Sequence, residues 1–110
     1  MSTHDLFRGC LESIVLNLLR GHRKMYGYEI TQKAKELTRG ELIIKEGTLY
    51  PLLHKMESEG ILISEVEHVE NRLRKYYTLT PTGKKKTKKS MAELSAFIQT
   101  IQMLLSHKTA

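Results

Sequence analysis

Residues 46–80 read EGTLYPLLHKMESEGILISEVEHVENRLRKYYTLT, and the periodicity of this stretch changes at Gly60. Before Gly60, apolar side chains recur at the spacing of one helical face. This predicts a helix over residues 46–59 with an inward stripe of Leu49, Leu52, Leu53 and Met56. After Gly60, β-branched and aromatic residues predominate on both sides of a short polar link at residues 70–71. The pattern predicts a β-hairpin with strands over residues 61–68 and 72–80.

Two helices are expected upstream of this stretch. Apolar residues recur every three or four positions over residues 5–20, and Gly21 ends that first helix. A second helix is expected from residue 27 or 28 to about residue 38. Its inward stripe consists of Ile30, Ala34 and Leu37.

One long helix is expected downstream, from about residue 82 to about residue 106. Phe97 and Leu104 broaden one side of its apolar seam. Because only about two heptads are present, the spacing predicts a pairing helix and not an extended coiled coil. The seam residues alternate three and four apart: Met91, Leu94, Ile98, Ile101 and Leu105.

The 110 residues carry a formal net charge of +6, and the excess lies mostly at the C-terminal end. Residues 81–110 hold six basic side chains and one acidic side chain, chiefly in the lysine run over residues 84–89. A basic balance makes a polyanion the first partner to test. The run itself fits either a solvated helix start or a patch that faces phosphates.

Composition and motifs exclude several classes of protein. The one cysteine, Cys10, cannot form an internal disulfide, and no apolar run is long enough to span a membrane. The first residues lack the pattern of a signal peptide, so we expect a cytoplasmic protein. The histidines lack metal-ligand spacing, and no nucleophile–base pair, glycine-rich phosphate loop or carboxylate pair appears. We therefore expect neither catalysis nor a metal or other cofactor.

Three helices followed directly by a hairpin give the order of a winged helix-turn-helix, an α+β fold that is mostly helical. We expect the winged helix-turn-helix domain over residues 1–81, and the long helix, over residues 82–110, packed on the same domain. In this fold the third helix enters the major groove of DNA and the hairpin contacts the backbone or the minor groove.

The outward face of the helix over residues 46–59 suits a DNA groove. Gly47 and Pro51 are small in profile, so the helix can approach the groove floor closely. Tyr50, His54 and Lys55 supply hydrogen-bond donors for base edges or phosphates. The alternative is an ordinary solvated helix face.

The hairpin carries Arg72, Arg74 and Lys75, which suit phosphate contact or insertion into the minor groove. The alternative is that acidic residues of the first strand, such as Glu65 and Glu67, pair with these cations across the strands. Tyr76 and Tyr77 alternate between faces, so we expect one of them to anchor the hairpin to the core.

Four segments together resemble the PadR family of bacterial transcriptional regulators. They are YGYEI at residues 26–30, EGTLYPLL at residues 46–53, ESEGIL at residues 57–62 and RKYYTLT at residues 74–80. The resemblance covers about residues 6–105, and one helix after the hairpin is similar to the compact subgroup of this family.

The resemblance implies a homodimer that binds double-stranded DNA at a palindromic operator, usually as a repressor. It implies that Tyr28 contacts phosphate, that Thr48, Tyr50, Pro51, His54 and Lys55 lie at the groove, and that Arg72, Arg74 and Lys75 lie on the wing. The first and last helices would form the two-fold interface. The interface residues would be Phe7, Leu11, Met91, Leu94, Phe97, Ile98, Ile101 and Leu105.

A small-molecule effector is a further expectation, but compact relatives that stack flat aromatic drugs use a tryptophan, and this chain has none. Two competing hypotheses use the same fold. One is a protein-interaction module with an acidic partner, and the other is a drug-sensing protein whose chemistry lies between the subunits.

Overall fold

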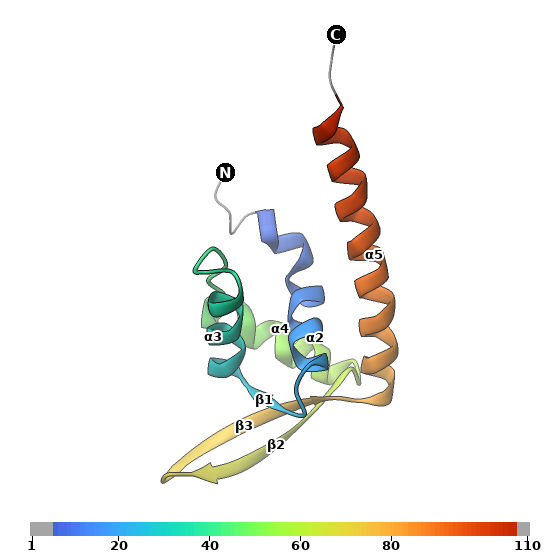
Figure 1. Ribbon diagram of the computed structural model, residues 1–110. Coiled ribbons are helices and arrows are strands. Elements are labelled where there is room, and N and C mark those ends of the chain that lie inside the picture. Colours follow the sequence, from blue (N-terminus) through green and yellow to red (C-terminus); the bar gives the residue numbers. More distant parts are fainter. Residues whose placement is uncertain (1–5, 108–110) are drawn as a thin grey trace.

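The computed structural model describes residues 6–107, in which helices surround the base of a small twisted sheet and one long helix extends away (Figure 1). A short 3-10 turn, η1 (Arg8–Cys10), leads into α2 (Leu11–Arg20). The other helices are α3 (Gly27–Leu37), α4 (Glu46–Ser58) and α5 (Pro81–Ser106). This arrangement confirms the predicted winged helix-turn-helix fold. Asp5, the expected start of the first helix, lies outside the described residues.

The core forms where α2, α3 and α4 meet the sheet. Leu49, Leu53 and Met56 of α4 are fully buried, as the spacing predicts, whereas Leu52 is half-buried. The prediction for Leu37 is wrong, because 65% of its side chain is exposed. Leu37 is the last residue of α3, and the chain then folds back so that Leu42 occupies the core instead.

The hairpin consists of β2 (Leu62–Val69) and β3 (Arg72–Leu79), paired antiparallel from Leu62 with Leu79 to Val69 with Arg72. Glu70 and Asn71 both have positive φ angles, as a tight two-residue hairpin turn requires. The sequence did not predict β1 (Met25–Tyr26), which pairs with β3 on the side opposite β2. Two residues are too short to show a strand period. Tyr77 is the residue that anchors the hairpin, since only 1% of it is exposed.

The start of α5 is locked onto the body of the molecule by small residues. Thr80 caps the helix by accepting a hydrogen bond from the Gly83 N–H, and its hydroxyl approaches the carbonyl oxygens of residues 60 and 61. Gly83 and Thr87 are the buried residues of this helix.

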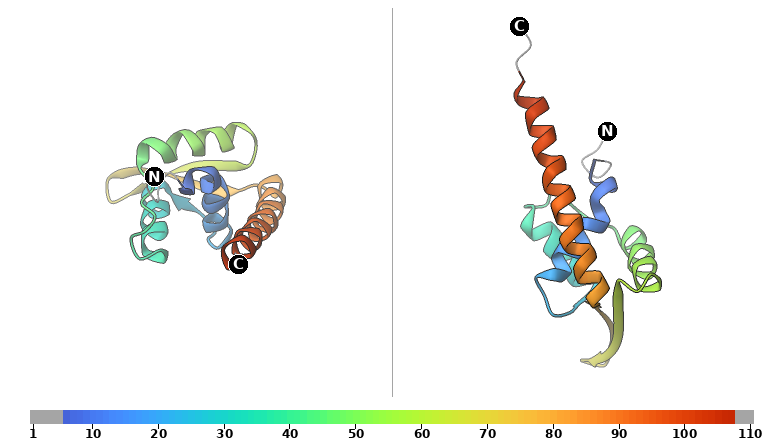
Figure 2. Two further views of the ribbon diagram at one scale, coloured as in Figure 1. Left: turned by 90° about the horizontal axis from the view of Figure 1, so that it is seen from above. Right: turned by 90° about the vertical axis from the view of Figure 1, so that its right-hand side faces the viewer.

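Beyond these first turns α5 extends away from the domain, so the described molecule measures 63 × 29 × 20 Å (Figures 1 and 2). None of the helices described between residues 6 and 107 is long and apolar enough to cross a membrane.

Candidate nucleic-acid interface

The outer face of α4 is open to solvent along its length. Gly47, Tyr50, Pro51, His54 and Lys55 are all exposed, and Thr48 is half-buried at the flank. Pro51 lies inside the helix and cannot donate to the carbonyl of Gly47, yet α4 continues without a break to Ser58. The helix face that the sequence predicts to meet DNA is therefore exposed to solvent.

Tyr50 is held in place by a glycine on another helix. A Cβ atom at Gly27 would lie 2.9 Å from Cε1 of the Tyr50 ring, so the ring packs directly on the α3 backbone. Burial raises the pKa of the Tyr50 hydroxyl, and the Glu46 carboxylate adds to the effect. The hydroxyl, which is protonated at neutral pH even at the ordinary tyrosine pKa, can donate a hydrogen bond to a partner.

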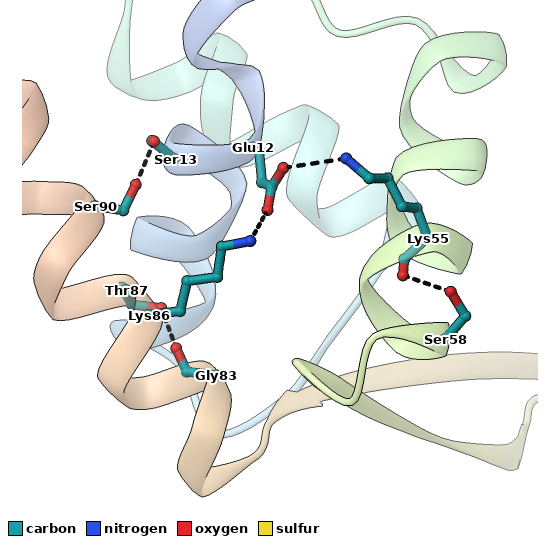
Figure 3. Close-up of polar contacts among 8 residues, drawn as sticks. All are labelled: Glu12, Ser13, Lys55, Ser58, Gly83, Lys86, Thr87 and Ser90. Atoms are coloured by element: carbon teal, nitrogen blue, oxygen red, sulfur yellow. Dashed lines mark hydrogen bonds and ion pairs between the residues drawn. The ribbon is translucent and has the colours of Figure 1, made fainter.

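Lys55 shares an acidic partner with the long helix. Glu12 of α2 lies 3.8 Å from Nζ of Lys55 and 2.8 Å from Nζ of Lys86 (Figure 3). The hydrogen bond and charge of Glu12 raise the pKa of Lys86. Beside this pair, the hydroxyl groups of Ser13 and Ser90 bond to each other. The recognition-helix candidate α4 and helix α5 are thus tied to the same residue of α2, a link that periodicity alone does not reveal.

The three predicted wing cations differ in their surroundings. The Arg74 guanidinium lies 4.5 Å from the centre of the Tyr26 ring and is half-buried, whereas Arg72 is exposed near the turn. Lys75 lies 3.3 Å from Glu57 of α4, so it joins the wing to that helix.

The acidic residues of β2 have a partner that the sequence did not indicate. Register places Glu67 opposite Arg74, but Glu67 bonds to Lys24, and Glu65 lies 3.7 Å from the same lysine. Among the described residues no ion pair joins Arg72 or Arg74 to Glu65 or Glu67, so cross-strand pairing with these two acids does not hold for the arginines. Glu70, in the link between the strands, interacts electrostatically with Arg74. Lys24 was missed because it precedes β1, the strand that the sequence did not predict.

A cleft of about 260 Å³ separates α4 from the wing. It gathers four of the predicted DNA-contacting residues, namely Tyr50, His54, Arg74 and Lys75, around a wall that includes Tyr26, Gly27, Leu73 and Tyr77. Tyr28 lies outside this cleft, is exposed, and stacks near Tyr26 with 6.4 Å between ring centres. Thr48, Pro51, Lys55 and Arg72 also lie outside it.

The predicted interface residues divide into two groups. Phe97, Ile98, Ile101 and Leu105 are exposed on α5, while Phe7, Met91 and Leu94 are half-buried. Leu11, which was expected at the dimer interface, lies in the core of its own chain. Only 4% of it is exposed, so its side chain has almost no surface to offer a partner.

Comparison with known proteins places these features in context. The chain matches the family described as "Transcriptional regulator PadR-like family" over residues 15–89. It is 41% identical over 61 residues to a transcriptional regulator of Mycobacterium tuberculosis. The matched segment covers 56% of this chain and 54% of that protein.

Solved structures agree over nearly the whole chain. A transcriptional regulator from Clostridium thermocellum has a TM-score of 0.81 at 33% identity, covering 90% of this chain and 96% of that one. A PadR family transcriptional regulator from Eggerthella lenta has a TM-score of 0.80 at 31% identity, covering 94% and 88%.

Proposed function

The chain belongs to the PadR-like family of transcriptional regulators, which bind DNA and are not enzymes. From this premise we propose that it represses transcription as a homodimer on a palindromic operator. Each protomer would place α4 in a major groove and the wing on the adjoining backbone. Two copies would read successive turns about 34 Å apart on one face of the duplex. The protein would act in the cytoplasm, where bacterial DNA lies.

One observation carries the proposal: Tyr50 and His54 of α4 and two of the wing cations, Arg74 and Lys75, line the same cleft. Tyr50 and His54 would contact base edges or phosphates there, with Thr48 and Pro51 against the groove. Arg74 and Lys75 would contact the backbone from the other wall, and Arg72 would extend the contact toward the minor groove. Tyr28 and Lys55 would contact phosphates at either side.

The apolar side of α5 supports the proposed homodimer. Phe97, Ile98 and Leu105 expose 61%, 49% and 80% of their surface, which is unusual for a run of large apolar side chains on one helix. We assign residues 1–81 to DNA binding and residues 82–110 to dimerisation. The interface would comprise Phe7, Met91, Leu94, Phe97, Ile98, Ile101 and Leu105.

Control by a small molecule is supported by a hollow between the first helical turns and α5. It has a volume of about 290 Å³ and includes Leu6, Cys10, Leu94 and Phe97 in its lining. A ligand there would shift α5 and so change the separation of the two α4 helices.

DNA selection followed by binding measurements tests the proposal. The full chain should enrich palindromic fragments, and the complex should weaken steeply with salt. His54→Ala and Arg72→Ala should lower affinity for the selected site about tenfold, whereas Lys35→Ala, which removes an exposed lysine of α3, should leave it unchanged. Absence of a sequence-preferring, salt-sensitive complex would refute the proposal.

A further inference from the structure

The lysine run at the start of α5 does not face one direction. Lys86 pairs with Glu12, and Lys85 and Lys89 line a shallow hollow that also contains Glu93. Lys84 and Lys88 are one helical turn apart and line a different hollow, beside the end of α2. The net charge of the run is therefore distributed over separate environments.

The second hollow, the basic groove, has a volume of about 750 Å³. Four cations surround it: Arg20 and Arg23 at the end of α2, and Lys84 and Lys88 on α5. His22 lies between the two arginines in sequence, and its Nδ1 is 2.8 Å from the carbonyl oxygen of Leu18. The remaining lining is Leu19, Gly21, Thr78 and Leu79. Among the residues that the structure describes, no aspartate or glutamate lines the groove.

The cations of this groove differ from the ion-paired lysines elsewhere in the described chain. Elsewhere between residues 6 and 107, Lys24, Lys75 and Lys86 each have a carboxylate partner within 4 Å. Arg20, Lys84 and Lys88 have no such partner among the described residues. Arg23 interacts at longer range with Glu67, a carboxylate already bound by Lys24. Four cations so placed repel one another, and a bound anion would relieve that repulsion.

The α5 wall of the groove is docked closely against the body of the molecule. Gly83 packs against the Ile61 backbone, and Thr87, between Lys84 and Lys88 in sequence, is fully buried with its hydroxyl donating to the Gly83 carbonyl. Leu19 and Leu79 form a buried apolar floor. The cations are thus presented around a preformed hollow whose volume is in the range of small-molecule sites.

The basic groove is distinct from the DNA-binding face. Both views of Figure 2 place α4 on one side of α2 and the turn that follows α2 on the other side. The exposed apolar residues Phe97 to Leu105 lie toward the far end of α5. An occupant of the groove would therefore contact neither the operator nor the apolar half of α5.

We propose that the basic groove binds a polyphosphate, a small molecule with several closely spaced negative charges. The phosphate oxygens would accept hydrogen bonds from the guanidinium and ammonium groups.

Calorimetric titration of the full chain at physiological salt tests the proposal, with ATP and inorganic tripolyphosphate as probes. The double variant Lys84→Gln/Lys88→Gln should weaken binding of both probes about tenfold or more. Lys85→Gln/Lys89→Gln removes the same charge from the same helix, on the side of the acid-containing hollow, and should change binding less than about twofold. Far-ultraviolet circular dichroism and thermal unfolding confirm that both variants are folded.

Three results would overturn the proposal. Saturable binding of neither probe would remove the site. Equal weakening by the two double variants would attribute binding to diffuse charge. Loss of affinity for the selected DNA site in Lys84→Gln/Lys88→Gln alone would assign the groove to the DNA backbone. If the chain fails to bind DNA but binds polyphosphate as described, the groove stands and the repressor proposal falls.

Discussion

Gly27 leaves room for the ring of Tyr50. A substitution that fills this space tests whether DNA binding requires the ring in its packed position. A methyl group at residue 27 would lie 2.9 Å from the ring, which must swing aside because the backbone of α3 cannot. Gly27→Ala should change the free energy of unfolding by less than about 1 kcal/mol, since the ring lies at the surface and alanine favours a helix. Affinity for the selected DNA site should fall about tenfold.

Gly21→Ala is the matched control for this substitution. The new Cβ would lie 3.7 Å from the Leu18 carbonyl oxygen, an ordinary contact. Fluorescence anisotropy with labelled DNA measures both variants. Unchanged affinity in Gly27→Ala would show that Tyr50 does not need its packed position.

Glu57 provides a pH-dependent contribution to stability. The Ser64 hydroxyl donates to its carboxylate, and this bond, with Lys75, lowers the pKa of Glu57. A lowered folded-state pKa stabilises the protein above the unfolded pKa, which is about 4.3, and this contribution is lost as the pH falls through the folded value. Ser64→Ala should cost about 1 kcal/mol of unfolding free energy at pH 7, with the cost shrinking toward pH 3.

Urea unfolding across that pH range measures the effect. Ser58→Ala is the control, because its hydroxyl donates to the uncharged carbonyl of Lys55 and its effect should not depend on pH. A cost for Ser64→Ala that stays constant from pH 7 to pH 3 would contradict the assigned role of Glu57.

At the scale of helices and strands, the sequence predicted the long helices and both strands of the hairpin, and it missed the two-residue strand β1. The boundaries of α4 and α5 could be predicted because glycine, proline and apolar spacing act locally, within a few residues. β1 could not, since its two residues become a strand only through pairing with Tyr76 and Tyr77. For the same reason, the loop after α3, and not the helical period, decides that Leu42 is buried in the core while Leu37 is exposed.

In the candidate site, too, features that depend on local spacing could be predicted, and contacts between distant residues could not. The helical period predicts which face of α4 is exposed, because that depends only on spacing along the chain. It does not predict that Glu12 holds both Lys55 and Lys86, or that Lys24 takes the acids of β2. Those contacts join residues far apart in sequence, and a single sequence carries no local signal for them.

The start of α5 depends on one close approach. A Cβ atom at Gly83 would lie 2.1 Å from the carbonyl oxygen of Ile61, which is backbone and cannot move freely. Gly83→Ala should therefore lower the free energy of unfolding by about 2–3 kcal/mol, against the usual gain from alanine in a helix. Gly47→Ala, at an open position of α4, should be neutral or stabilising by up to about 1 kcal/mol. Chemical denaturation of the two variants measures the difference, and equal stability would exclude tight docking at this point.

At the scale of the whole molecule, the two ends of α5 have different surfaces. Its first turns dock through Gly83 and Thr87 and present the lysines, whereas the later turns extend beyond the domain with apolar residues in solvent. The positive charge and the apolar surface thus occupy different parts of one helix. With this separation, the proposed anion at one end of the helix would not interfere with the proposed pairing of two copies at the other end.

The pairing of two copies is open to a direct test at Ile98, which lies in the middle of the apolar seam. Ile98→Lys would place a charge between the two helices, where it would lose water without gaining a partner, so the protein should become monomeric or aggregate. Gln99→Lys adds the same charge one residue further, off the seam, and should remain dimeric. Light scattering coupled to size-exclusion chromatography gives the mass of each variant. Because a monomer presents only one α4, Ile98→Lys should also lose preference for palindromic over single half-sites. A dimeric Ile98→Lys variant would mean that the two copies meet elsewhere and that the exposed seam has another role.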